Sequence, residues 1–472
     1  MTELAHTATE ELAHFLAGLS GLSGLSGLSG LSGSSGSSGG IEPRLTAIAT
    51  DCLLDTVGAM VFGATQPWSR AAIEVAKAAG GSGPSTIIGD GTRTTPAQAA
   101  FANGASAHAF ELDDVHEEAI SHPGAAVIPA AFAIAEDRGA SGAELLAAIV
   151  VGYEAMGRAG IAVGPSAHML GGFHPTSMSG VFGSAAAVGH LLGFDGEQLT
   201  MAFGLAVTLA SGTMEFASSG GMAKRIHAGR AAEGGLTAAL LVAGGMEGAR
   251  DGLAGVYGFC RAFSPEPQIE LLTDRLGERW MTDELTIKPY AACSDIHPMI
   301  QATQELRAEH DLRPERIDRI EAEGPTKAAT QNSLDGTVSV MAAQYSAEFN
   351  IAAALLADPG DPATYRPERI ADPALADLQA KVVSVEAAPE FDATYAWRMG
   401  GRVTITLVDG TVLSRTVHGQ KGSMHQPLTA EELGRKFDHL VGGRARPELA
   451  DVIRTIADRP VADLGRALAP PD

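Results

Sequence analysis

The stretch "GAELLAAIVVGYEAMGRAGIA", residues 142–162, decides the fold class. Its apolar residues fall on more than one face at helical spacing, which predicts a helix that is buried on all sides. Similar segments rich in Ala, Leu and Val run from Ile41 to about Ala262, separated by breaks that contain Gly or Pro. We therefore expect a mainly α protein whose large first domain is all-helical.

The composition favours helices that pack closely. Apolar residues make up 45% of the 472-residue chain and aromatic residues only 5%, so Ala, Leu, Val and Gly must fill the interior. The formal net charge of −23 repels phosphate backbones and anionic membranes, so we expect neither nucleic acid nor a lipid surface as a partner. A chain of this length predicts two domains of unequal size.

A later part of the chain has a different pattern. In "RMGGRVTITLVDGTVLSRTV", residues 398–417, apolar residues alternate before the Asp409-Gly410 turn, which predicts a β-hairpin. Thr429 and Glu432 then stand at capping-box spacing and predict the start of another helix. This part of the chain is therefore expected to form a smaller α+β domain followed by terminal helices.

The expected organisation has five parts. A Gly-Leu-Ser repeat near the N-terminus has a period of three but no proline, so it predicts a flexible loop rather than a collagen-like helix. The parts are an N-terminal helix (1–17), the Gly/Leu/Ser low-complexity loop (18–40), a large helical domain (41–275), a smaller α+β lid domain (276–425) and C-terminal helices that return to the helical domain (426–472).

The cysteines and the N-terminus indicate a cytoplasmic protein. Cys52, Cys260 and Cys293 are widely spaced and odd in number, which predicts no disulfide framework. The first fifteen residues lack the basic region of a secretory signal. Unbroken apolar runs are much shorter than the roughly 20 residues that a membrane span requires.

The first candidate segment is "HAFELDDVHEEAISHPGAAVIPAAFAIAE", His108–Glu136, where acidic residues and histidines precede an apolar helix opened by proline. His116 with Asp113 and Glu117 has a spacing that could bind a metal ion. A solvated acidic loop that caps the helix is the alternative, and the local sequence favours it.

The second segment, "GGFHPTSMSGVFGSAAAVG" at 171–189, puts His174 at the N-terminus of a helix rich in small residues. The helix dipole disfavours the cationic form there, so His174 could act as a neutral base or donor. A plain surface histidine is the alternative.

The third segment, "SGGMAKRIHAGRAAEGGLTAALL" at 219–241, carries four potential cations in seven residues. Such a cluster could hold carboxylates by charge-assisted hydrogen bonds. Lys224 is the better candidate because it precedes the predicted helix, whereas Arg230 could simply pair with Glu233.

The fourth segment, "TIKPYAACSDIHPMIQA" at 286–302, has Lys288 and His297 on either side of a turn-rich stretch that contains Cys293. A Cys-His pair could support nucleophilic catalysis. No oxyanion motif lies nearby, and a small buried hydrophobic cysteine is the alternative reading.

These segments resemble the signature blocks of the MmgE/PrpD family, which includes 2-methylcitrate dehydratase, cis-aconitate decarboxylase and iminodisuccinate epimerase. The resemblance extends from about Ile41 to Phe437 and implies a large all-helical domain formed from both chain ends, a smaller α+β lid and a homodimer. The matching blocks are "LDD" with "HPGAAVIPAA", "GFHPTSMSGVFGSAAAVGHLLGFD", "KRIHAGRAAEGG", "KPYAACSDIH", "AQYSAEFNIAAALL" and "VHGQKGSMHQPLTAEELGRKF".

The resemblance also implies site residues, in a family pocket between the two domains. Histidines would remove and donate protons, and lysine would neutralise substrate carboxylates and the charge of an enolate-like intermediate. No metal and no cofactor are expected. The catalytic candidates are His122, His174, Lys224 and His297, and the substrate-binding candidates are Glu111, Asp114, Arg225 and Lys288.

The leading expectation is a cofactor-independent hydro-lyase that eliminates water from a 2-methylcitrate-like polycarboxylate. Decarboxylation of cis-aconitate and epimerisation of iminodisuccinate are the alternatives within the family. The sequence departs from relatives that act on aconitate: Val115 and Phe349 fall where Thr and Tyr are usual, and Ser294 falls where a basic residue is frequent. A non-catalytic binding or scaffold protein and a metal-dependent hydratase are alternatives of other classes.

Overall fold

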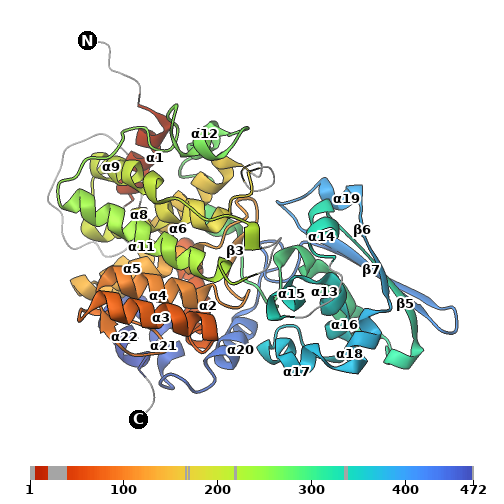
Figure 1. Ribbon diagram of the computed structural model, residues 1–472. Coiled ribbons are helices and arrows are strands. Elements are labelled where there is room, and N and C mark those ends of the chain that lie inside the picture. The colour runs from red at the N-terminus through yellow and green to blue at the C-terminus, as the bar shows by residue number, and fades with distance from the viewer. Residues whose placement is uncertain are drawn as a thin grey trace. The chain divides into compact units, whose positions relative to one another are not determined.

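The computed structural model describes residues 6–19, 40–164, 167, 171–216, 221–333 and 339–469. The chain forms two compact units, drawn in Figure 1. Unit 1 comprises Met1–Ala109, Asp113–Leu285 and Leu433–Asp472; unit 2 comprises Phe110–Leu112 and Thr286–Glu432. Helices dominate, which confirms the mainly α prediction. Nearly all of the Gly-Leu-Ser stretch predicted as a loop, residues 20–39, lies outside the described residues.

Unit 1 consists of helices with a few two-residue strands. Proline opens many of its helices, since its fixed φ suits the first turn and its missing N–H would be unpaired there anyway. The helices are α1 (Ala8–Ala17), α2 (Pro43–Gly63), α3 (Pro67–Gly80), α4 (Pro96–Ala107), α5 (Pro123–Arg138), α6 (Gly142–Val163), α8 (Pro175–Leu192), α9 (Gly196–Ala206), α11 (Lys224–Ala243), α12 (Phe259–Phe263), α20 (Ala430–Val441), α21 (Leu449–Arg454) and α22 (Val461–Ala467). The short strands are β1 (Ser85–Thr86), β2 (Arg93–Thr94), β3 (Val115–His116) and β4 (Leu285–Thr286), the last at the point where the chain enters unit 2.

Glycines let the central helices of unit 1 approach closely. A Cβ built on Gly104 of α4 would lie 2.7 Å from the Cα of Gly229 in α11, and one on Gly152 of α6 would lie 2.8 Å from the carbonyl oxygen of Gly183 in α8. No larger residue fits at such crossings without moving a helix. The small-residue composition is therefore what permits this packing.

The helix predicted from residues 142–162 is confirmed as α6, and every residue from Leu145 to Val163 is buried. Two helices, α2 and α6, are long and apolar enough to cross a membrane. The apolar window of α6 is 100% buried and that of α2 is 67% buried. Core helices have this property too, so the two helices are weak evidence for a membrane protein.

Unit 2 is built around a four-stranded sheet with strand order β6-β5-β7-β8. Strands β5 and β6 run parallel, and the other neighbouring pairs are antiparallel. The predicted hairpin is confirmed as β7 and β8, which Figure 1 shows beside the helices of this unit. The strands are β5 (Ile317–Gly324), β6 (Val382–Ala387), β7 (Gly400–Leu407) and β8 (Val412–His418), and the helices are α13 (His297–Glu309), α14 (Thr326–Gln331), α15 (Val340–Tyr345), α16 (Ala347–Leu356), α17 (Pro367–Ile370), α18 (Pro373–Gln379) and α19 (Pro389–Asp392).

The predicted capping box at Thr429 is also confirmed. The Thr429 hydroxyl accepts from the Glu432 backbone N–H at 3.2 Å, and the Glu432 carboxylate accepts from the Thr429 backbone N–H at 2.8 Å. These two bonds satisfy donors that the first turn of α20 would otherwise leave unpaired.

Candidate active site

Four buried histidines of unit 1 lie at the ends of helices that pack together. His108 follows the last residue of α4, His122 and His174 immediately precede α5 and α8, and His227 lies in the first turn of α11. Both α4 and α8 pack against α5 and α11, and the Gly104–Gly229 crossing brings the end of α4 close to the start of α11. Glycines and prolines far apart in the sequence therefore gather the four imidazoles.

The four rings form a row in the order His122, His108, His174, His227, and we call them the histidine array. The ring centroids of His122 and His108 are 5.0 Å apart, those of His108 and His174 are 5.5 Å apart, and those of His174 and His227 are 5.0 Å apart. Phe216 stands edge-on to His174, with a centroid separation of 5.7 Å. Imidazoles this close in a buried place can exchange or order protons.

Each ring of the array has a defined partner at Nδ1. His108 Nδ1 lies 2.6 Å from Oδ2 of Asp113, and His122 Nδ1 lies 2.7 Å from the backbone oxygen of Asp114. His174 Nδ1 and His227 Nδ1 lie 3.0 Å apart, so one of them donates and the other accepts. These contacts fix the orientation of the rings.

Burial keeps part of the array uncharged. Burial lowers the pKa of His174 well below its usual value, and the nearby His108 and Lys224 act in the same direction. Burial also lowers the pKa of His227 to about 4. Both rings are therefore neutral near pH 7, as predicted for His174, although burial rather than the helix dipole is the main cause.

Two cations of the third sequence segment are also buried in unit 1. Lys224 is the first residue of α11 rather than a residue that precedes it, and 2% of its side chain is exposed. Arg225 lies over the ring of Trp68 and donates from Nη1 to the backbone oxygen of His108 at 3.4 Å. Arg230 forms the predicted exposed pair with Glu233. The structure thus divides the cluster into buried Lys224 and Arg225 and an exposed surface pair.

Asp114 serves the fold of unit 1. Its Oδ1 accepts from the backbone N–H of Gly124 in the first turn of α5, and its Oδ2 accepts from the Tyr153 hydroxyl, both at 2.8 Å. Burial raises the pKa of Asp114 to about 7, even though these two bonds act in the opposite direction. Both oxygens of Asp114 are therefore engaged within unit 1, and its substrate-binding role stays a prediction.

His108, Asp113 and His122 offer ligand atoms that all lie within 4.8 Å of one another, a spacing that could hold a metal ion. The Nδ1 atom of His122 contacts the Asp114 carbonyl at 2.7 Å, so this nitrogen carries a proton and presents no lone pair. A metal bound through Nδ1 of His122 would have to displace that hydrogen bond. The residues therefore fit a hydrogen-bonded arrangement better than a metal site.

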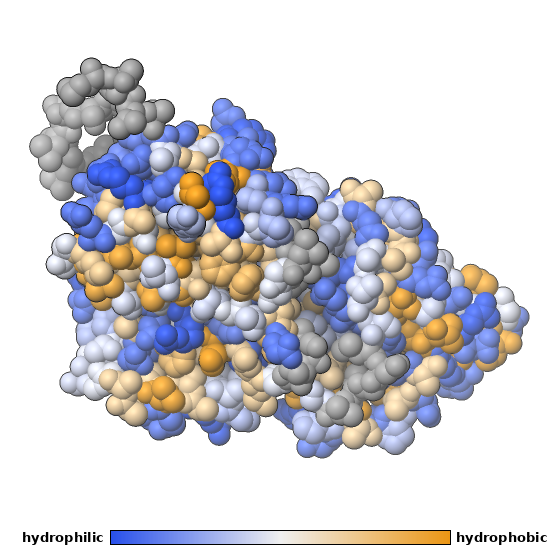
Figure 2. Space-filling view, turned by 45° about the horizontal axis from the view of Figure 1, so that its top comes forward, coloured by the Kyte–Doolittle hydropathy of each residue, from blue (hydrophilic) through white to orange (hydrophobic). Residues whose placement is uncertain are grey.

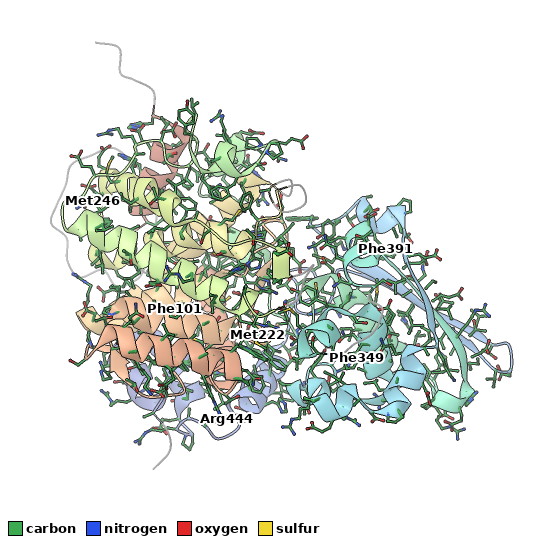
Figure 3. The ribbon with its side chains drawn as sticks, viewed as in Figure 1. Phe101, Met222, Met246, Phe349, Phe391 and Arg444 are labelled. Atoms are coloured by element: carbon green, nitrogen blue, oxygen red, sulfur yellow. The ribbon has the colours of Figure 1, made fainter. Side chains whose placement is uncertain are left out.

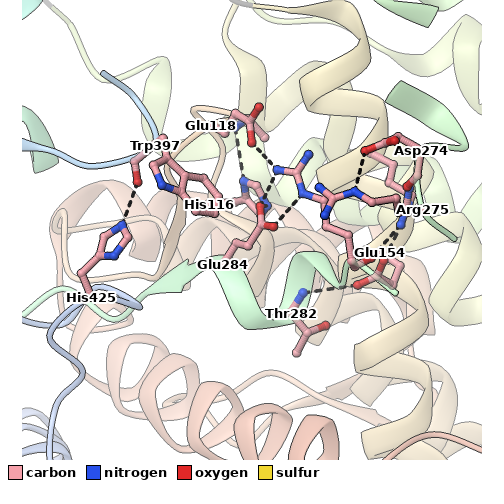
Figure 4. A network of polar contacts seen from close by, with 12 residues as sticks. His116, Glu118, Glu154, Asp274, Arg275, Thr282, Glu284, Trp397 and His425 are labelled. Carbon is pink, nitrogen blue, oxygen red and sulfur yellow. Dashed lines mark hydrogen bonds and ion pairs between the residues drawn. The ribbon is translucent and has the colours of Figure 1, made fainter. Parts of the chain in front are cut away.

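The trio His116, Asp113 and Glu117 considered from the sequence is not assembled as a site. His116 faces Glu284, with Nε2 3.6 Å from the carboxylate, and Arg279 binds both Glu284 and Glu118 (Figure 4). Burial lowers the pKa of His116 to about 4. This polar network stabilises the loop after α4. Asp113 instead contacts His108 of the histidine array.

In unit 2, Lys288 and Glu111 form a buried ion pair. Lys288 Nζ lies 3.3 Å from Glu111 Oε2, and the two side chains are 1% and 2% exposed. Glu111 has a positive φ of 56°, which is uncommon outside glycine. The structure therefore brings together two of the predicted substrate-binding residues.

His297 begins α13 in unit 2 and is completely buried. Its Nε2 donates to the backbone oxygen of Ala292 at 3.1 Å, and its ring centroid lies 5.1 Å from that of Tyr290. His297 and Lys288 belong to unit 2, and the other three catalytic candidates belong to unit 1.

A second charged cluster of unit 2 was not singled out from the sequence. Asp295 pairs with Lys327 at 3.1 Å and accepts from the Tyr395 hydroxyl at 3.2 Å. Burial alone would raise the pKa of Asp295, but Lys327, together with hydrogen bonds from Cys293 and Tyr395, outweighs it and holds this pKa below its usual value. Lys327 follows Asp295 by 32 positions, and Tyr395 follows Lys327 by 68. Such distances along the chain give no local sequence pattern that could have revealed the cluster.

The thiol alternative is not supported by the surroundings of Cys293. Its Sγ lies 3.5 Å from Oδ2 of Asp295, and burial raises the pKa of the thiol to about 11. A thiol that stays protonated at neutral pH is a poor nucleophile. Cys293 is therefore closer to the alternative of a small packed residue, although it is only partly buried.

Comparisons with known proteins identify the family of the chain. Residues 39–272 match the MmgE/PrpD N-terminal domain and residues 290–459 match the MmgE/PrpD C-terminal domain. Cis-aconitate decarboxylase of Aspergillus terreus is 30% identical over 415 residues, covering 83% of this chain and 84% of that protein. Cis-aconitate decarboxylases of Homo sapiens and Mus musculus are 30% and 28% identical, covering 82% of this chain and 81% and 80% of their own lengths. The chain therefore belongs to the MmgE/PrpD family.

Proposed function

We propose that this protein is a cofactor-independent lyase that decarboxylates cis-aconitate or a closely similar tricarboxylate. Three relatives that share about 30% identity over more than four fifths of the chain are named for this reaction. The expected 2-methylcitrate dehydration is thereby displaced by the family's decarboxylation alternative. These relatives decide the choice of reaction, and the observation that carries acid-base chemistry is the histidine array beside Lys224 and Arg225.

The buried cations suit a substrate with several carboxylates. An ammonium and a guanidinium in a place shielded from water bind carboxylates more strongly than they would at the surface. In unit 1 these are Lys224 and Arg225, and their charges would also stabilise the electron pair that a departing carboxylate leaves on carbon.

The array supplies groups for proton transfer near neutral pH. Decarboxylation of a tricarboxylate consumes one proton, because the carbon that loses carbon dioxide ends with a new C–H bond. Neutral His174 and His227 can accept protons. At His122 the Asp114 carbonyl holds Nδ1, which leaves Nε2 as the nitrogen that can exchange a proton with the substrate. These properties match acid-base catalysis.

Phe349, one of the departures from aconitate-acting relatives, belongs to the interior of unit 2. It is completely buried in α16 and its ring lies 5.8 Å from that of Tyr365; Figure 3 labels it among the helices of this unit. A hydroxyl at this position would lie in the packed core. Its loss therefore does not weigh against a tricarboxylate substrate.

The other family expectations form part of the proposal. We propose a role for Lys288 and His297 of unit 2 in the same reaction, a lid function for unit 2, a cytoplasmic location and a homodimer. Exposed apolar side chains at α11 of unit 1 and at its ends support self-association. Figure 2 shows orange patches on unit 1. The exposed side chains are Met222, Ile226, Leu240, Leu241 and Met246.

One assay separates the candidate reactions. Purified protein is incubated with cis-aconitate, 2-methylcitrate and iminodisuccinate, and products are followed by proton NMR together with released carbon dioxide. Carbon dioxide and a decarboxylated alkene from cis-aconitate are the expected result. Water loss from 2-methylcitrate alone would return the function to a hydro-lyase, inversion of iminodisuccinate would make it an epimerase, and no turnover of any would favour a binding protein.

A further inference from the structure

His108 occupies a central position in the histidine array, and the proposed function gives it no individual role. It is 1% exposed, and its ring lies between those of His122 and His174. Its partner Asp113 is fully buried, with Oδ2 2.6 Å from His108 Nδ1. A carboxylate sequestered at this distance from an imidazole requires a physical explanation, because burying a charge is costly.

The partner of each ring distinguishes His108 from its neighbours. His122 Nδ1 contacts a backbone oxygen at 2.7 Å and lies farther from Asp113, at 3.5 Å. His174 and His227 contact each other. Opposite charge stabilises a protonated imidazole, and among these four rings the shortest contact to a carboxylate belongs to His108. His108 is thus the ring of the array best placed to carry a proton.

We propose that His108 is the proton donor of the reaction and that Asp113 is the positioning residue that stabilises its imidazolium. This inference rests on the proposed decarboxylation and names the acid within that site. Asp113 holds the Nδ1–H, which leaves the Nε2–H as the proton to be transferred.

The proton balance of the step is simple. The bond between one carboxylate carbon and the carbon skeleton breaks, carbon dioxide leaves, and the electron pair stays on the skeleton. That pair forms a C–H bond with the Nε2 proton, and His108 becomes neutral. Solvent returns one proton to His108 before the next turnover, so each cycle consumes one proton from water.

The charges around His108 make its protonation depend on the substrate. Asp113 faces it from the same loop, His122 from α5 and His174 from α8. From α11, Arg225 reaches its backbone oxygen, and Lys224 raises the local positive potential that also acts on His174. A bound polycarboxylate neutralises the two cations and thereby favours the imidazolium, so binding should take up a proton.

The first test replaces His108 with Asn. The amide nitrogen of Asn stands where Nδ1 does and can still donate to Asp113, but it cannot carry a transferable proton. We expect kcat on cis-aconitate to fall by about 10²–10⁴-fold, the range for loss of a general acid, while KM changes little. His108→Gly should regain part of this activity when imidazole is added. A kcat for His108→Asn within threefold of the wild-type value would overturn the proposal.

The second test replaces Asp113 with Asn and follows kcat against pH. Without the carboxylate the imidazolium is less stable, so the alkaline limb of the profile should move to lower pH. The matched control is His116→Asn, a buried histidine beside a carboxylate in the polar network of Figure 4, for which the profile should not move. An alkaline limb that stays in place in Asp113→Asn contradicts the positioning role.

A readout without turnover separates this inference from the proposed function. Calorimetric titration with tricarballylate, a saturated tricarboxylate, in two buffers of different ionisation enthalpy measures protons taken up on binding. Uptake by the wild type and its loss in His108→Asn support His108 even if cis-aconitate proves not to be the substrate. Equal uptake in both proteins overturns the proposal. Activity that a chelator abolishes and a divalent metal restores would also overturn it, because His108, Asp113 and His122 would then be metal ligands.

Discussion

Two groups of buried ionisable side chains, one in each unit, avoid an unpaired buried charge by opposite means. In unit 1, two rings of the histidine array are neutral, since burial lowers the pKa of His174 and His227. In unit 2 the charges are retained and paired: Lys288 with Glu111, and Lys327 with Asp295. The difference follows from side-chain chemistry, because an imidazole can lose its proton near neutral pH whereas a buried lysine and carboxylate stabilise each other's charge.

This contrast bears on function. Groups that change protonation near neutral pH are suited to proton transfer, and groups that stay charged are suited to holding anionic ligands or to fixing the fold. Unit 1 also contains Lys224 and Arg225 next to the array, so it holds both kinds. Unit 1 therefore has the composition of a catalytic region, and the role of the unit 2 pairs can be tested through stability as well as activity.

The largest expected effect is on activity in unit 1. Lys224→Ala should reduce kcat/KM on cis-aconitate by about 10²–10³-fold, because a buried cation that stabilises developing charge is lost. His174→Ala should be similarly impaired. Arg230→Ala, on the same helix but 58% exposed and paired with Glu233, is the matched control and should keep its activity. Steady-state kinetics with all three variants provide the check; full activity in both Lys224→Ala and His174→Ala would show that the site is assigned wrongly.

The next effect concerns the Lys288–Glu111 pair. Lys288→Met leaves the Glu111 carboxylate buried without its ammonium partner, which should cost roughly 3–5 kcal/mol. Adding Glu111→Gln should recover much of this free energy. Chemical denaturation and turnover of the single and double variants are compared. If the double variant regains stability but not activity, Lys288 binds substrate; if it regains both, the pair is structural; unchanged stability in Lys288→Met would refute the predicted cost.

A third prediction uses the neutral ring of His227. Its pKa is about 4 when folded and near 6.5 when unfolded, so the unfolded chain binds the proton first as pH falls. The free energy of unfolding should therefore decrease between pH 6.5 and about pH 4, by up to about 3 kcal/mol from this group. His227→Gln should show a smaller decrease over that interval in denaturation curves. Identical pH dependence in both proteins would mean that His227 is charged in the folded state.

Sequence patterns predicted the features that depend on neighbours along the chain. The buried helix at 142–162, the β7–β8 hairpin and the capping box at Thr429 are governed by local periodicity or turn chemistry, and all three are confirmed. The family blocks predicted membership of the MmgE/PrpD family, which the matches to its N-terminal and C-terminal domains confirm. The choice between dehydration and decarboxylation depended on full-length relatives, since both reactions use the same residue types.

The partners of individual site residues could not be predicted. The sequence contains His108 and Asp113 five residues apart, but only the fold shows their 2.6 Å contact and the rings on either side. Asp114, adjacent in sequence, is directed instead at Gly124 and Tyr153. Two neighbouring carboxylates with different roles cannot be distinguished by motif, because a turn between helices sets the direction of each.

The smallest expected effect compares two lysine–glutamate pairs that differ mainly in exposure. Lys421 Nζ lies 2.9 Å from Glu432, closer than Lys288 is to Glu111, but the two side chains are 25% and 29% exposed. Because water screens such a pair, Lys421→Met should change the free energy of unfolding by only about 0–1 kcal/mol.

Lys421, followed by Thr429, lowers the pKa of Glu432 to about 2, so any contribution of the pair to stability should be lost as pH falls from about 4.5 towards 2. Denaturation of Lys421→Met beside Lys288→Met tests whether burial or distance decides the value of an ion pair. A cost for Lys421→Met that equals the cost for Lys288→Met would show that distance decides, and the contrast between paired and neutral buried groups would then lose its physical basis.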